Sequence, residues 1–167
     1  MGDKTPYHMA GTHRHECKLR AREHEISESK WRSLSTFLTV LSALSGVVAG
    51  ATLVTSRPAG TPWAFTAGAF ALLGAAALAV DAKLECKANA EAHRSAAVGF
   101  EDMRSVYATL ENNVQGLSIE QARVELKEAY AKTVELAKVS PLVEAGSRKK
   151  REREDAKKEE KKALVGA

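Results

Sequence analysis

Two long stretches without an ionisable side chain dominate the hydrophobic pattern of this chain. The first runs from Ser33 to Ser56 and the second from Pro58 to Val80. If helical, each extends about 34–36 Å, enough to cross a hydrocarbon core about 30 Å thick. Buried core helices of a soluble protein are the alternative, but such apolar segments usually stop after about 10–14 residues. The pattern predicts two transmembrane helices, spanning about residues 33–56 and 60–80.

The flanking residues predict how these helices are oriented. The short link from Ser56 to Pro62 contains two prolines, which favour a turn and make the helices antiparallel neighbours. Trp31 and Trp63 lie at opposite ends of this hairpin, where interfacial rings are enriched. Basic residues precede the first span and follow the second, whereas the link holds only Arg57. The positive-inside rule therefore predicts a multi-pass protein of the inner (cell) membrane with both termini in the cytoplasm.

Outside the spans the pattern is helical. We expect residues 1–11 to be disordered, residues 12–31 to form a cytoplasmic helix, and the second span to continue without a break through Asp81 to Ala88. A heptad seam follows, and Ser118 with Gln121 makes a capping-box pattern before a second helix that Ser140 and Pro141 end. The cytoplasmic seam consists of Phe100, Met103, Tyr107, Leu110 and Val114 packed against Leu126, Tyr130 and Leu136.

These elements predict an all-α fold, a two-transmembrane helical hairpin with a cytoplasmic N-terminal helix and a C-terminal helical hairpin. Residues 12–145 form the membrane domain and residues 146–167 a charged tail. The tail carries the net charge of +4, with nine Lys or Arg against five Asp or Glu between Arg148 and Lys162. It has no interleaved aromatic residues for base stacking, so we expect no nucleic-acid binding and favour a solvated tail drawn to anionic lipid.

The remaining composition argues against catalysis. The cytoplasmic segments are too divided to build a large enzyme core, and Gly-rich phosphate loops, nucleophile elbows and paired catalytic carboxylates are absent from the sequence. His13, His15, Cys17 and His24 match no tight zinc spacing. We therefore expect no enzyme activity, no catalytic residue, no metal and no cofactor, and we expect Cys17 and Cys86 to remain reduced.

The first span has an unusual polar face. Small and hydroxylated side chains recur on it every three or four residues, and such a face either packs closely against another helix or lines a wetted passage in an oligomer. The candidate pore-lining residues are Ser35, Thr39, Ser42, Gly46 and Thr52. The candidate helix-packing residues, small enough to let backbones approach, are Gly46, Gly50, Ala67, Ala71 and Ala75. His93 with Arg94 is a candidate ligand contact, such as a phosphate, or else part of a solvated helix face.

The arrangement resembles the SLATT family, two-transmembrane effector domains associated with SMODS nucleotidyltransferases and SLOG sensor domains in bacteria. The resemblance covers about residues 13–145. It is carried by the basic helix ending at Trp31, the short-linked spans, the stretch from Ala90 to Phe100 with Met103, Tyr107 and Leu110, and the turn from Lys138 to Pro141. It implies a pore-forming effector that a cytoplasmic, nucleotide-linked signal triggers to disrupt the membrane in antiviral (anti-phage) defence.

The sequence favours one function, a pore-forming effector, and leaves one alternative. Two spans cannot enclose a channel alone, so a pore requires a homo-oligomer in membrane lipid, with a nucleotide second messenger or a nucleotide-sensing protein as its partner. Alternatively, the hairpin only anchors a coiled-coil adaptor that recruits a soluble partner without forming a pore.

Overall fold

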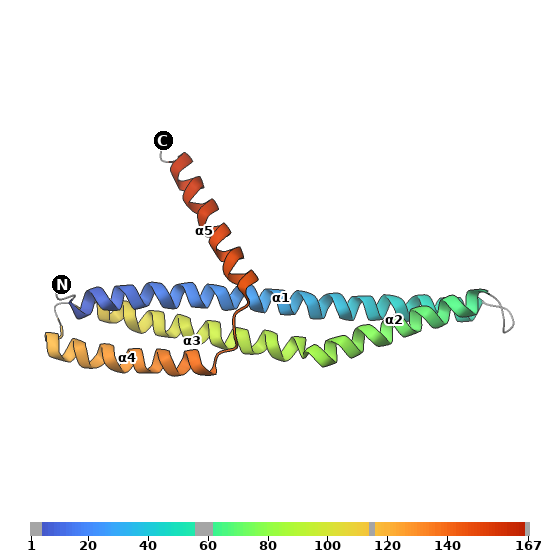
Figure 1. The fold of residues 1–167 in the computed structure, drawn as a ribbon, viewed down its shortest axis with the longest axis horizontal. Coiled ribbons are helices and arrows are strands. Elements are labelled where there is room, and N and C mark those ends of the chain that lie inside the picture. Colours follow the sequence, from blue (N-terminus) through green and yellow to red (C-terminus); the bar gives the residue numbers. More distant parts are fainter. Residues whose placement is uncertain (1–4, 56–61, 114–115, 166–167) are drawn as a thin grey trace. The chain divides into compact units, whose positions relative to one another are not determined.

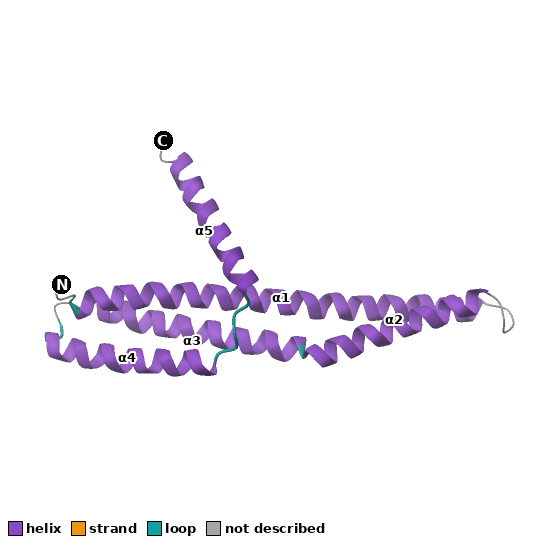
Figure 2. Cartoon of the chain, viewed as in Figure 1, coloured by secondary structure: helices purple, strands orange, loops and turns teal. Residues whose placement is uncertain are grey.

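The computed structural model describes residues 5–55, 62–113 and 116–165. Within them all regular structure is helical, which confirms the predicted all-α class (Figures 1 and 2). The helices are α1 (Pro6–Thr55), α2 (Pro62–Leu84), α3 (Cys86–Asn112), α4 (Ile119–Val139) and α5 (Ala145–Val165). Residues 56–61 of the predicted link and Val114 of the predicted seam lie outside the described residues. So do the side chains of residues 53–55 and 62–64, Trp63 among them.

The chain divides into two compact units. One comprises residues up to Glu28 together with those from Glu91 onward, and we call it the bundle unit. The other comprises Ser29–Ala90 and is called here the two-helix unit. Helices α1 and α3 each contribute residues to both units.

In the bundle unit, α3 and α4 and the first part of α1 lie side by side around one core (Figure 1). The Tyr107 side chain is fully buried, and its hydroxyl lies 3.0 Å from Oγ1 of Thr133 on α4. At the start of α4, Ser118 and Gln121 form the predicted capping box, and the helix ends with Ser140 as its C-cap. The core contains Ala10, Cys17, Ala21, Phe100, Met103, Tyr107, Leu110, Leu126 and Ala129.

The N-terminal segment differs from the expected disorder over residues 6–11. Helix α1 already begins at Pro6, and Ala10 is buried. The Tyr7 hydroxyl donates a 3.0 Å hydrogen bond to the carbonyl oxygen of Leu117, ahead of α4. This segment is ordered because it packs on the same core as α3 and α4, a tertiary interaction that local polarity does not reveal.

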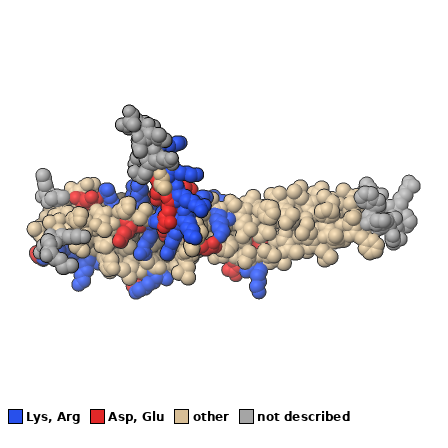
Figure 3. Space-filling model, turned by 45° about the horizontal axis from the view of Figure 1, so that its top comes forward, with Lys and Arg blue, Asp and Glu red and all other residues tan. Residues whose placement is uncertain are grey.

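The two-helix unit contains the second part of α1 and α2. Two helical stretches, within Pro6–Thr52 and Phe65–Asn112, are long and apolar enough to cross a membrane. Only 22% of the apolar segment in the first stretch and 17% of that in the second is buried. In Figure 3 the blue and red side chains gather over the bundle unit, while the described surface of the two-helix unit is mostly tan.

The expected continuity from α2 into α3 is interrupted at Glu85. This residue has φ 47°, the left-handed region, and separates α2 from α3. The Asn89 side-chain amide donates a 2.8 Å hydrogen bond to the carbonyl oxygen of Leu84, which the break leaves without its helical partner. The interruption therefore has a local cap even though the sequence holds no Gly or Pro there.

Candidate functional site

The polar face of the first predicted span is mainly the seam between α1 and α2. Its α1 members follow the alternating three and four spacing of a heptad seam, and opposite them Ala67, Gly74 and Ala77 are buried on α2. A Cβ placed on Gly74 would lie 3.2 Å from Cβ of Ser45 and 3.3 Å from the carbonyl oxygen of Ser42. The seam on α1 consists of Ser35, Leu38, Ser42, Ser45, Ala49 and Thr52.

This seam divides the candidate pore-lining residues into two groups. Ser35 is buried and Ser42 and Thr52 are half-buried in the seam, whereas Thr39 and Gly46 are exposed. The Thr52 hydroxyl lies 2.9 Å from the carbonyl oxygens of both Val48 and Ala49, so it can donate its hydrogen bond within its own helix. Ser45, which is 3% exposed, is a polar seam residue that was not among the candidates. The sequence signal that could have identified Ser45 as a seam residue is its position three residues after Ser42.

Most of the candidate helix-packing residues point away from the seam. Only Ala67 is buried, while Ala71 and Ala75 are exposed, and a Cβ on Gly46 or Gly50 would meet no atom within 4 Å in the described part of the chain. Gly46, Gly50 and Ala75 each lie one residue after a buried seam position, and Ala71 follows Phe70, which has the heptad spacing of the α2 seam but is 37% exposed. In two antiparallel helices, positions with that offset fall on the same side of the pair. The two-helix unit thus has a small-residue face, formed by Thr39, Ala43, Gly46, Gly50, Gly68, Ala71 and Ala75.

The predicted cytoplasmic seam is brought together in the bundle unit. Phe100, Met103, Tyr107, Leu110 and Leu126 are buried in one cluster, and Leu136 packs against it half-buried. Tyr130 differs, because it is 51% exposed. The seam also has a third partner that the sequence reasoning missed. Helix α1 supplies Ala10 and Cys17, which are seven residues apart, and small or polar side chains gave this stripe a weak hydrophobic signal.

A buried histidine pair is the most unusual chemical feature of the bundle unit. Nδ1 of His24 on α1 lies 2.9 Å from Nδ1 of His93 on α3, and both residues are 3% exposed. Phe100 stacks on the His24 ring with centroids 5.5 Å apart. At this distance one Nδ1 donates and the other accepts, so at least one ring has an unprotonated Nδ1.

The surroundings of the pair disfavour the imidazolium form. Burial, followed by His93 and Arg20, lowers the pKa of His24 to about 4. Burial also lowers the pKa of His93, against a smaller opposing effect of the Glu144 carboxylate. The pair is therefore neutral near pH 7. Arg94, predicted to act with His93 on a ligand, is exposed, so the structure separates the two candidate residues by burial.

Helix α5 is bound to α1 by a hydrogen bond and ion pairs close to the histidine pair. The hydroxyl of Ser27 donates a 2.9 Å hydrogen bond to that of Ser147, and both residues are buried. Arg151 lies 3.0 Å from the Glu23 carboxylate, and Arg22 lies 3.0 Å from that of Glu154. Residues 146–165 of the predicted charged tail are thus helical, and Arg151 and Glu154 form ion pairs with α1.

A cavity of about 580 Å³ lies between α1 and the segment leading into α5 and reaches His24. Its lining holds three arginines, among them Arg20 and Arg151, and three glutamates, among them Glu23. Its formal charges therefore balance. No group of three or more His, Cys, Asp or Glu side chains in the described ranges is placed to hold a metal ion.

Comparison of this chain with protein families, with curated proteins and with solved structures finds no match.

Proposed function

We propose that this chain is a membrane effector whose two-helix unit crosses the inner membrane of a bacterium and assembles into a pore. A cytoplasmic, nucleotide-linked signal would trigger it, so that it disrupts the membrane in anti-phage defence. The trigger and the defence role rest on the resemblance to SLATT effectors. The membrane location and the assembly are supported by the surfaces of α1 and α2.

The exposure of large apolar side chains carries the proposal. Phe37 is 62% exposed, Val47 69%, Phe65 77% and Leu72 74%. In a soluble protein a continuous apolar surface of this kind would be covered by other elements. In a bilayer the same side chains lie against acyl chains, and helices satisfy their own backbone hydrogen bonds. With basic residues before α1's apolar part and after that of α2, we place both termini in the cytoplasm.

The small-residue face supports assembly. Lipid tails are as apolar as leucine, so helices associate in a membrane through close packing, which glycine and alanine permit. A Cβ added to Gly46 or Gly50 would have no atom of the described residues within 4 Å, which leaves room for another helix. We propose that a second copy packs there.

Cysteine cross-linking in lipid tests this interface. Ala43 on the small-residue face and Leu44 beside it are both exposed and lie at almost the same depth in α1. Ala43→Cys should give an oxidised dimer band, whereas Leu44→Cys, the matched control, should give little. The parent chain serves as the blank, because Cys17 and Cys86 are both buried and free. Equal cross-linking of both variants would count against this face.

The adaptor remains a second candidate, because Ser35 and Ser45 are buried inside the seam of the two-helix unit. Seam hydroxyls that pack within one chain do not line a passage in this conformation.

Ion leak from liposomes distinguishes the two functions. Thr39, Ser42 and Thr52 replaced together by Leu should abolish leak from a pore; unchanged leak would argue against a hydroxyl-lined passage. An adaptor should keep its role when an unrelated two-span hairpin replaces residues 33–80.

A further inference from the structure

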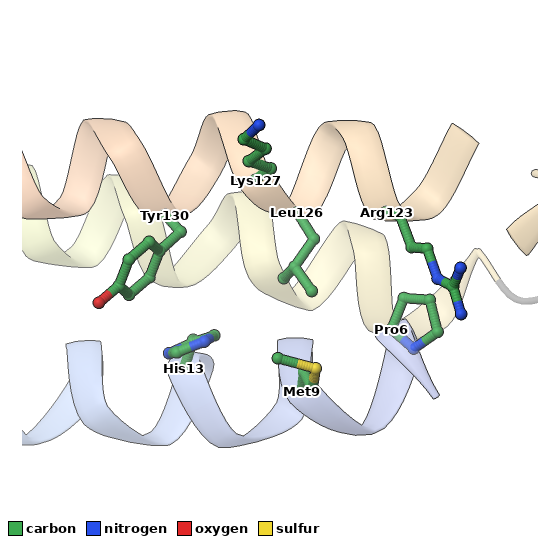
Figure 4. Close-up of a pocket in the computed structure, with 7 residues that line it drawn as sticks. All are labelled: Pro6, Met9, His13, Arg123, Leu126, Lys127 and Tyr130. Atoms are coloured by element: carbon green, nitrogen blue, oxygen red, sulfur yellow. The ribbon is translucent and has the colours of Figure 1, made fainter. Parts of the chain in front are cut away.

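A cavity at one end of the bundle unit differs from the others in its chemistry. It has a volume of about 470 Å³ and lies between α1 and α4 (Figure 4). Leu126 points from α4 toward Met9 of α1, and Tyr130 lies beside His13. These side chains present an apolar and aromatic wall, and the volume falls within the range of about 300–1,000 Å³ typical of small-molecule sites.

The charged residues of this lining are all cations. Arg123 and Lys127 line the cavity, and among the described residues no carboxylate does. Arg123 has an ion pair with Glu120 at 3.1 Å, but both side chains are more than half exposed. Such surface pairs are weak, so an incoming anion can replace Glu120 at little cost. The 580 Å³ cavity near His24, by contrast, matches its arginines with glutamates.

The ends of two helices add to the positive potential. Pro6, the first residue of α1, lines the cavity, and α4 begins at Ile119, one turn before Arg123. The Tyr7 hydroxyl bonded to Leu117 at 3.0 Å holds these two beginnings together. Helix N-termini carry a partial positive charge and favour anions. Cations, the start of α1 and an apolar wall thus converge on one opening, and the start of α4 lies one turn away.

We propose that this cavity binds a small amphipathic organic anion, with its apolar body against Met9, Leu126 and Tyr130 and its carboxylate or similar head group at Arg123 and Lys127. The site is independent of pore formation, because all its residues belong to the bundle unit. It is also separate from His93 and Arg94, which do not line it.

Methyl NMR of the full-length protein in phosphatidylcholine nanodiscs tests the proposal. Methionine methyl groups labelled with ¹³C place one probe in the cavity, at Met9, and one in the core, at Met103. The ligand probe is 2-naphthoate, and its matched analogues are neutral 2-naphthamide and cationic 2-naphthylmethylammonium. We expect 2-naphthoate to shift the Met9 signal saturably without shifting Met103, and to bind about tenfold or more tightly than either analogue.

Matched variants test the role of the two cations. Arg123→Gln with Lys127→Gln should weaken 2-naphthoate binding by about tenfold or more. Lys132→Gln with Lys138→Gln removes the same charge from exposed positions of α4 outside this cavity and should leave binding unchanged. An unshifted Met103 signal shows that each variant is folded.

Three results would overturn the proposal. Equal binding of all three naphthyl probes would show that the cavity selects only for apolar groups. Equal loss of 2-naphthoate affinity in both double variants would show that binding depends only on the overall charge of the protein. No saturable Met9 shift with 2-naphthoate, or with the longer anion laurate, would exclude the anion site. If an acidic amphipathic peptide alone shifted Met9, the face would instead belong to a protein partner.

Discussion

Acidification should destabilise the bundle unit through its buried histidine pair. The ordinary pKa of a histidine is about 6.5, and that of His24 in the folded protein is lowered to about 4. Between pH 6.5 and pH 4, His24 is protonated in the unfolded chain but neutral in the folded chain. The free energy of unfolding therefore falls as the pH drops below 6.5, and the loss is complete near pH 4.

The size of the effect follows from the shift. One pKa unit corresponds to about 1.4 kcal/mol, so His24 alone contributes about 2 kcal/mol of destabilisation at pH 5 and about 3 kcal/mol at pH 4. His93 acts in the same direction, because its pKa is also lowered. For a chain of this length, 2 kcal/mol corresponds to a decrease in Tm of about 4–8 °C.

Thermal unfolding in nanodiscs, followed by circular dichroism at pH 7.5 and pH 5, measures this loss. His24→Gln should reduce the difference between the two Tm values, whatever its effect on Tm at pH 7.5. His15→Gln is the matched control, since His15 is exposed on the same helix, and it should keep the full difference. An unchanged pH difference in His24→Gln, or an NMR titration of His24 near pH 6.5, would refute the reasoning.

Three further predictions concern packing and backbone. Tyr107→Ala should lower the free energy of unfolding by about 3–5 kcal/mol, because Tyr107 is fully buried, whereas Tyr130→Ala, at a 51% exposed position, should cost less than about 1 kcal/mol in a urea titration. Gly74→Leu should lower Tm by forcing α1 and α2 apart, at a cost of about 1–3 kcal/mol. Gly68→Leu should not, because a Cβ added there has no atom of the described residues within 4 Å. Glu85→Gly should stabilise the protein by about 1 kcal/mol by relieving the left-handed backbone, and an equal gain from Glu85→Ala in the same urea titration would contradict this cause.

Local patterns in the sequence predicted the features that depend on neighbouring residues. The capping box at Ser118 lies within a single turn, so its spacing alone indicates a helix start. The seam from Phe100 to Leu110 repeats over about three turns, so its spacing indicates which side of the helix is covered. The spacing of Ser35 and Ser42 likewise indicated a polar stripe. It did not indicate that α2 covers this stripe, because a buried seam and a pore wall require the same periodicity.

Features that depend on distant partners could not be predicted. His24 and His93 are separated by 69 positions, and nothing near either residue indicates its partner. The stripe on α1 that completes the core consists of Ala10, Cys17 and Ala21, and these small side chains give a weaker amphipathic signal than large apolar residues would. The break at Glu85 depends on an amide from Asn89 rather than on Gly or Pro.

The small-residue face has a consequence for how mutations are tolerated. At Gly46 and Gly50 an added Cβ meets no atom of the described residues within 4 Å, and an alanine there would even favour the helix by about 1 kcal/mol. In a mutational scan, selection for expression alone should accept or prefer larger residues at these positions, while selection for biological activity should reject them. Two such fitness maps, compared position by position, would trace the outline of the interface without a structure of the assembly.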